Sequence, residues 1–336
     1  MGKIPFKALI KISISATMLF ILLSFVKKHD LLAVCASTPL WLIPGIALGY
    51  IISQFISAWR WHLVLRFGGI RRKFTNVLSA HLVGVYMNVF GFGTVGGDLG
   101  KAMLVGGVKQ AGIEAVASVA ADRLIGMAVL AAIGLVFAAF VPEAKVFWQY
   151  GLVPVLLVLG TAAGLAGVVF LRRILRRASS AWARKLNDAL RMAPSSPSQI
   201  GAVIAVALLF HFEQIVLFWL MTYAVGTPIP LRYLLATIPA VNILSTLPIS
   251  WMGVGVRETL YVLFFAPRYL DEPQALLFGG IWLAGMVVAA GFGGLVSLWR
   301  IDDLNVLTRQ QASELEAMAA ELDLQQPLTS SAAAKK

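Results

Sequence analysis

The sequence has few charged residues, and this scarcity excludes a soluble globular domain as its main part. Asp, Glu, Lys and Arg make up 13% of the 336 residues, whereas soluble domains contain about 25%. Acidic residues are the scarcer of the two signs, with 16 against 28 basic residues. The single cysteine, Cys35, excludes an intrachain disulfide and leaves the redox compartment open.

Several chemical motifs are also absent. The sequence contains no G-x-x-x-x-G-K-[ST] phosphate-binding loop, so it gives no sign of ATP-driven chemistry. It has no His/Cys spacing typical of a metal site and no serine in a nucleophile elbow, and Asp302-Asp303 lacks a third acidic partner. We therefore predict no catalytic residue, no metal and no cofactor. The basic segment 172–197 is explained by membrane topology and attraction to anionic lipids rather than by nucleic acid.

Long apolar runs dominate what is present. Hydrophobic residues make up 59% of the chain, the mean hydropathy is +0.82, and apolar stretches of about 20 residues recur throughout. This pattern predicts an all-α polytopic membrane protein, with one membrane domain over 1–300 and a cytoplasmic tail over 301–336 that is first helical and then disordered. We interpret the first apolar run, 8–26, as an uncleaved helix because charged residues follow it directly without a clean cleavage site.

The distribution of Lys and Arg predicts the topology. Basic residues concentrate in the loop that starts at Arg60 and in segment 172–197, so both are expected in the cytoplasm. Both termini are then cytoplasmic, in a multi-pass protein of the inner membrane. The predicted full spans are 8–26, 40–59, 111–140, 150–171, 198–225 and 274–298. Tryptophans near predicted helix ends are expected to anchor the protein at the membrane interface: Trp59, Trp61, Trp148 and Trp299.

Two further apolar segments, 74–106 and 232–266, must each enter and leave on the same side for this topology to hold. The first breaks at "GFGTVGG" and the second at "LPISWMGVG". An asparagine precedes each break, and a pair of charged residues follows it: Asn88 with Asp98 and Lys101, and Asn242 with Arg257 and Glu258. We interpret these segments as broken, re-entrant hairpins of opposite orientation, related by a pseudo-two-fold axis in the membrane plane.

Paired broken segments indicate a transport site near the midplane of the membrane. Broken backbone cannot face lipid, because its polar groups would lack partners, so it must be buried or line a wet cavity. Glycine allows backbone N–H groups to converge on an anion, and the candidate positions are Gly96, Gly97, Gly253 and Gly255. The alternative is that these glycines only allow close helix packing.

Ionisable residues at membrane depth cost about 3 kcal/mol each on insertion scales, so they are candidates for function. Arg257 is the foremost, because a guanidinium binds phosphate oxygens in a two-pronged manner. The alternative for Arg257 is a structural pair with Glu258 or Asp122. Asp98 either belongs to the site or caps a helix. Lys101 either binds phosphate, pairs with Asp98 or extends to the cytoplasm.

Two predicted helices carry polar stripes that face the protein interior. In 111–140, Glu114, Ser118 and Asp122 share a small, polar face, and Arg123 lies on another. A structural ion pair of Asp122 and a functional role remain equal alternatives. In 198–225, the stripe consists of His211, Gln214 and Thr222, with Glu213 pointing elsewhere, and His211 is expected to be a hydrogen-bonded interior histidine. Three of these residues are candidates for proton or ion coupling: Asp122, His211 and Glu213.

Four motifs resemble those of the lysylphosphatidylglycerol synthase transmembrane-region, or flippase-like, family: "SAWRWHLVLR", "VFGFGTVGGDLGKAMLV", "ASVAADRLIGMAVL" and "LPISWMGVGVRETLYVLF". The resemblance covers most of 1–300. It implies a stand-alone lipid translocator without the aminoacyl-transferase domain, and it does not identify the headgroup. It also implies that the family's pattern positions are Gly96, Gly97, Asp98, Asp122, Arg123, Gly253, Gly255, Arg257 and Glu258.

The sequence thus favours translocation of a phosphate-bearing lipid between leaflets, with the headgroup bound by the two hairpins. Two alternatives remain open. One is an enzyme, as the membrane half of a lipid or polyprenyl-phosphate transferase, and the other is a non-transporting scaffold for lipid synthesis. The expected partners are a membrane lipid and a separately encoded lipid-modifying enzyme.

Overall fold

The computed structural model describes residues 39, 42–90, 93–106, 110–141, 194, 196–246, 250–266 and 268–299. The predicted spans 8–26 and 150–171, nearly all of segment 172–197, Trp148 and the tail 301–336 lie outside the described residues. All regular structure in the described ranges is helical. The helices are α3 (Leu42–Phe67), α4 (Phe74–Phe90), α5 (Gly93–Gly106), α6 (Gln110–Phe140), α10 (Pro197–Ala224), α11 (Leu231–Ser245), α12 (Val256–Phe265) and α13 (Glu272–Trp299).

Three of these helices are long and apolar enough to cross a membrane, namely α10, α13 and the Glu114–Phe140 part of α6. The complete helices α6, α10 and α13 begin and end within two residues of the predicted spans 111–140, 198–225 and 274–298. Helix α10 begins where its sequence predicts, because the Ser196 hydroxyl accepts a hydrogen bond from the Gln199 N–H and proline occupies the first helical position.

Helix α3 is longer than predicted. The expected end at residue 59 is wrong, because the helix continues to Phe67. Arg60 therefore lies inside the bundle, 5% exposed, rather than in a loop. Trp61 is fully buried, and its indole N–H donates to the Ser118 hydroxyl at 3.0 Å, so its prediction as an interface anchor is also wrong. Trp59 is exposed on the same helix.

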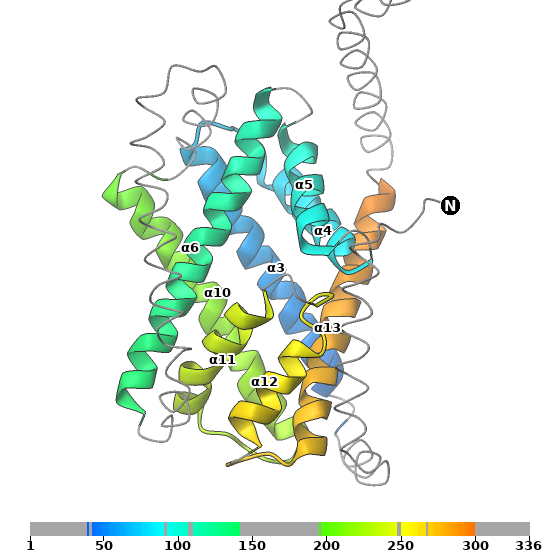
Figure 1. The fold of residues 1–336 in the computed structure, drawn as a ribbon. Helices are drawn as coiled ribbons and strands as arrows, with labels where there is room; N and C mark the ends of the chain where they lie inside the picture. The colour runs from blue at the N-terminus through cyan, green and yellow to red at the C-terminus, as the bar shows by residue number, and fades with distance from the viewer. Residues whose placement is uncertain are drawn as a thin grey trace, which may run out of the picture.

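Two pairs of shorter helices approach the centre of the bundle from opposite ends (Figure 1). One pair consists of α4 and α5, with 17 and 14 residues, and the other of α11 and α12, with 15 and 10 residues. A transmembrane helix needs about 20 apolar residues. Each of these four helices is therefore shorter than a typical complete span.

The two breaks differ from each other. In the first pair, α4 ends at Phe90 and α5 already begins at Gly93, so the predicted seven-residue break is too long, and Gly96 and Gly97 are helical. In the second pair, α11 ends at Ser245 and α12 begins at Val256, which confirms the predicted break. Gly253 and Gly255 have φ angles of 78° and 85° there, which residues other than glycine rarely adopt.

The helix packing has an internal symmetry. The four helices α3, α4, α5 and α6 can be matched in order with α10, α11, α12 and α13. When each helix is replaced by its match, every principal contact between two helices becomes another contact that is also observed. Thus α4 packs on α13 as α11 packs on α6, and α5 packs on α6 as α12 packs on α13, while α3 and α10 pack on each other. Because the short pairs enter from opposite ends (Figure 1), the exchange also reverses direction along the bundle. An inverted repeat would produce this pattern of helix contacts.

Candidate functional site

A polar cavity of about 270 Å³, called the central cavity below, lies between the two helix pairs. Residues of both pairs line it, together with residues of α3, α6, α10 and α13. Its polar and charged lining comprises Tyr50, Gln54, Ser57, Arg60, His81, Asn88, Asp98, Lys101, Asp122, Arg123, His211, Gln214, Asn242 and Thr246. Both predicted asparagines and four of the predicted charged residues thus meet in one space.

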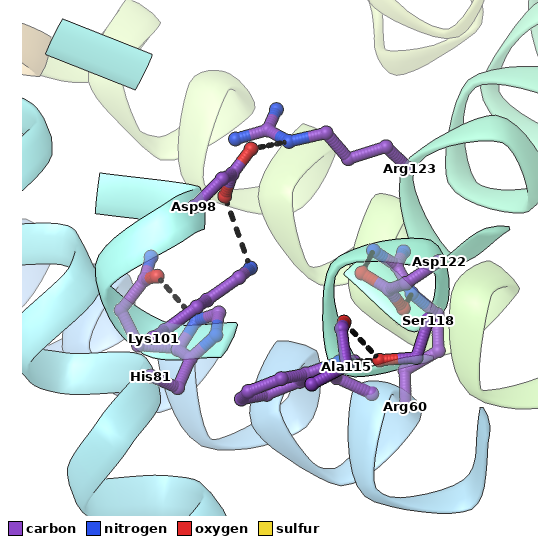
Figure 2. A network of polar contacts seen from close by, with 10 residues as sticks. Arg60, His81, Asp98, Lys101, Ala115, Ser118, Asp122 and Arg123 are labelled. Atoms are coloured by element: carbon purple, nitrogen blue, oxygen red, sulfur yellow. Dashed lines mark hydrogen bonds and ion pairs between the residues drawn. The ribbon is translucent and has the colours of Figure 1, made fainter. Parts of the chain in front are cut away.

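On the α5 side of this cavity, one carboxylate bridges two cations. Asp98 Oδ2 accepts a short hydrogen bond from Arg123 Nε, and Asp98 Oδ1 lies 3.2 Å from Lys101 Nζ (Figure 2). The Lys101 ammonium also lies 5.1 Å from the centre of the Trp61 ring, a cation–π geometry. Lys101 is 5% exposed, so it does not extend to solvent. One carboxylate thus holds two positive charges together across α5 and α6.

On the α6 side, Arg60 and Asp122 form a two-pronged pair. Arg60 Nε donates to Asp122 Oδ1 at 2.6 Å, and Nη2 donates to Oδ2 at 3.0 Å. Both side chains are buried. Gly126, one turn after Asp122, makes room for the guanidinium, because a Cβ there would lie 2.9 Å from Arg60 Nη1. Asp122 and Arg123 thus use separate faces of α6, as predicted from their spacing.

Two buried histidines complete the wall. His81 Nε2 lies 3.3 Å from the Gln54 side-chain oxygen, to which it donates. His211 Nε2 donates to the Gly126 carbonyl oxygen at 2.8 Å. That bond joins α10 to the same turn of α6 that accommodates Arg60, so it stabilises the position of the Arg60–Asp122 pair.

Several buried polar atoms of the cavity lining have no hydrogen-bond partner among the described residues. They are Arg60 Nη1, His81 Nδ1, Asn88 Oδ1 and Asp98 Oδ1, the last of which has only its ion pair with Lys101. Buried polar groups are almost always paired, so these atoms are available to water or to a polar ligand in the cavity. The set includes a donor on Arg60 and acceptors on Asn88 and Asp98.

Gly97 has a packing role in the structure. A Cβ at Gly97 would lie 2.1 Å from Asn88 Oδ1 and 2.2 Å from the Gly84 carbonyl oxygen, so glycine is needed where α5 meets α4. Gly96 is one residue earlier in α5 and is half-buried. The close contact holds Asn88 at the cavity wall, so Gly97 positions a lining residue without lining the cavity itself.

The charged residues after the second break lie outside the cavity lining. Glu258 is buried, and its Oε2 accepts a hydrogen bond from the Gly255 N–H at 2.6 Å, which caps α12. Arg257 has no acidic partner among the described residues, so neither expected pair, with Glu258 or with Asp122, is formed. Its Nε is buried without a hydrogen bond.

Glu213 is separate from the cavity. Its Oε2 accepts a hydrogen bond from the Ser53 hydroxyl at 2.5 Å, between α10 and α3. Of the three residues predicted for proton or ion coupling, Asp122 and His211 line the cavity and Glu213 does not. Their coupling role stays a prediction.

Sequence reasoning missed Arg60 and His81. Arg60 was assigned to a cytoplasmic loop because basic residues follow it. The signal that could have found it is the spacing of Gln54, Ser57 and Arg60, which recur every three residues and so share one helix face. His81 is seven residues before Asn88, which places both on one face of α4 by the same rule.

The fold and the cavity define a polytopic helical membrane protein with a charged internal site. The lining holds three basic side chains (Arg60, Lys101, Arg123) and two carboxyl groups (Asp98, Asp122), which gives a formal excess of one positive charge when the two histidines are not counted. The chain belongs to the family described as the lysylphosphatidylglycerol synthase transmembrane region, which it matches over residues 8–301. Comparison with curated proteins finds no match. The family membership implies a lipid-related function in the membrane.

Proposed function

We propose that this protein moves a phosphate-bearing lipid between the leaflets of the membrane, with the headgroup held in the central cavity. The observation that carries the proposal is the convergence of buried cations and unpartnered polar atoms between two helix pairs that approach from opposite ends. Paired broken helices around a midplane site are the arrangement expected of a transporter that exposes its site alternately.

The size of the cavity fits a headgroup better than a whole lipid. At about 270 Å³ it is just below the range of about 300–1,000 Å³ typical of small-molecule pockets. Two acyl chains do not fit in such a volume. In this account the chains remain in the bilayer while the headgroup crosses the polar interior.

The charges support an anionic group on the ligand. Lys101 and Arg123 share one carboxylate, Asp98, so the pair of cations retains one uncompensated positive charge. A phosphate that enters between them gains charge-assisted hydrogen bonds, the stronger class in proteins. Asp98 then acts as the counter-ion that the two cations hold when no headgroup is present.

The membrane arrangement is part of the proposal. We expect α4–α5 and α11–α12 to be re-entrant hairpins in an inner-membrane protein with both termini in the cytoplasm. A separately encoded enzyme is expected to make or consume the lipid. Arg257, in the first turn of α12, is expected to contact the headgroup in a second conformation.

The test is reconstitution of the purified protein into liposomes that carry labelled phosphatidylglycerol in one leaflet only. We expect the lipid to appear intact in the other leaflet, with its mass unchanged. A chemically altered lipid would instead support the membrane half of a transferase. A lipid that neither moves nor changes, across phosphatidylglycerol, phosphatidylethanolamine and polyprenyl phosphate, would support the scaffold.

A further inference from the structure

A second pocket, separate from the central cavity, lies where α3 ends and α10 begins. It encloses about 530 Å³ and is lined by His62, Arg66, Phe67, Arg71, Arg72 and Gln199. It shares no lining residue with the central cavity. None of the residues just named is acidic, and three carry a permanent positive charge.

No carboxylate of the described residues neutralises the three arginines. Within the part of the chain that the structure describes, none of them has an acidic partner within 4.0 Å. Arg72 is held in place because its Nε donates to the Val105 carbonyl oxygen at 3.0 Å, which leaves its other nitrogens for a ligand. Arg66 and Arg71 are exposed.

Two further features favour an anion in this pocket. The His62 side chain lies against the Phe74 ring, and its buried Nδ1 has no hydrogen-bond partner in the part of the chain that the structure describes. Gln199 is at the third position of α10, so the positive end of the α10 dipole lies at the pocket. The negative C-terminal end of the α3 dipole attracts cations such as Arg66. It does not explain why the positive N-terminal end of α10 lies at the same pocket.

From these observations we propose that the pocket between α3 and α10 binds a phosphate group, carried either by a lipid headgroup or by a small soluble phosphate. Guanidinium groups bind phosphate oxygens in two-pronged fashion, and three of them converge here. Arg66 follows Arg60 of the central cavity by six residues, about 9 Å along the helix. The pocket is therefore placed to hold a phosphate at the end of the bundle, close to the central cavity.

The test is native mass spectrometry of the purified full-length protein in an uncharged detergent. Two probes are titrated separately, a short-chain phosphatidylglycerol and inorganic phosphate. The variants are Arg66→Gln/Arg71→Gln, the charge-preserving Arg66→Lys/Arg71→Lys, and Lys73→Gln. Lys73 is the matched control, because it is an exposed cation of the same loop that does not line the pocket.

We expect Arg66→Gln/Arg71→Gln to lose one bound copy of the probe, with at least about tenfold weaker binding at that site. The lysine variant should retain part of the affinity, and Lys73→Gln should bind like the wild type. If the double glutamine variant loses binding of the lipid probe alone, the ligand is a lipid headgroup. If it loses binding of inorganic phosphate, the ligand is a soluble phosphate. Arg66→Gln alone replaces the double variant if the latter fails to fold.

Two results would overturn this proposal. One is an unchanged number and affinity of bound probes in the double glutamine variant, and the other is an equal loss in Lys73→Gln. The inference is independent of the translocation proposal. Lys101→Gln, in the central cavity, should remove a different bound copy, so failure at one site is distinguishable from failure at the other.

Discussion

Arg60 of α3 and Asp122 of α6 form a buried, two-pronged ion pair, with nitrogen–oxygen distances of 2.6 and 3.0 Å. The pair joins two long helices at the wall of the central cavity. Arg60 Nη1 has no hydrogen bond to any of the described residues. The pair therefore has a structural part, which is the contact with Asp122, and a free donor that a ligand can use.

We expect Asp122→Asn to destabilise the protein strongly, by about 3–5 kcal/mol, because it leaves the buried Arg60 charge without its partner. Arg60→Met/Asp122→Leu should recover most of that stability, since it removes both charges together. Thermal unfolding in detergent measures the first effect and the recovery. If the double variant recovers both stability and transport, the free donor of Arg60 has no part in the site.

Gly97→Ala should weaken the contact between α4 and α5 by about 1–3 kcal/mol, the usual cost of overpacking. The added Cβ would lie 2.2 Å from the backbone oxygen of Gly84, which cannot move independently. Gly280→Ala is the matched control, because that glycine is also helical and has nothing within 4 Å of an added Cβ. An equal thermal midpoint for the two variants would contradict the packing role of Gly97.

Arg257→Ala should lower transport without lowering the thermal midpoint. A buried guanidinium nitrogen without a partner costs free energy, so its removal does not weaken the fold. Arg257→Lys should retain part of the activity, because it keeps the charge and loses the two-pronged contact. A lower midpoint with unchanged stabilisation by short-chain phospholipid would identify Arg257 as a structural residue and remove it from the site.

Glu258→Gln should leave both stability and transport close to wild type, because the amide oxygen can accept the same hydrogen bond from the Gly255 N–H. Glu258→Ala should cost about 0.5–2 kcal/mol, the range for a lost helix cap. Thermal unfolding and the liposome assay are measured on both variants. Loss of transport in the stable glutamine variant would mean that the charge of Glu258 contacts the substrate.

Helices α6, α10 and α13 were predictable because their long apolar runs determine them, whereas the predicted end of α3 was wrong. The predicted bounds of α6, α10 and α13 each lie within two residues of the observed ones. The second break was predictable because Gly253 and Gly255 must adopt positive φ angles. The first break was predicted too long, since the cost of glycine in a helix is offset where α5 packs closely on α4.

The composition of the site was only partly predictable. Asn88, Asp98, Lys101 and Asp122 were identified because polar residues at membrane depth are costly and rare. Arg60 was missed because the basic residues that follow it suggested a loop. Which carboxylate pairs with which cation depends on how α3, α5 and α6 cross, and local spacing does not contain that information.

The central claim is that the lipid headgroup crosses through the cavity, and Lys101 tests it most directly. Lys101→Gln removes a buried cation from the cavity and leaves Asp98 paired with Arg123, so the fold should survive. The measurement is the rate at which phosphatidylglycerol crosses the bilayer of liposomes that contain only the purified protein, compared with Lys73→Gln and with protein-free liposomes. The account predicts rapid crossing for the wild type and for Lys73→Gln, and at least about tenfold slower crossing for Lys101→Gln. A wild-type rate equal to that of protein-free liposomes, or a Lys101→Gln rate equal to that of the wild type, would contradict it.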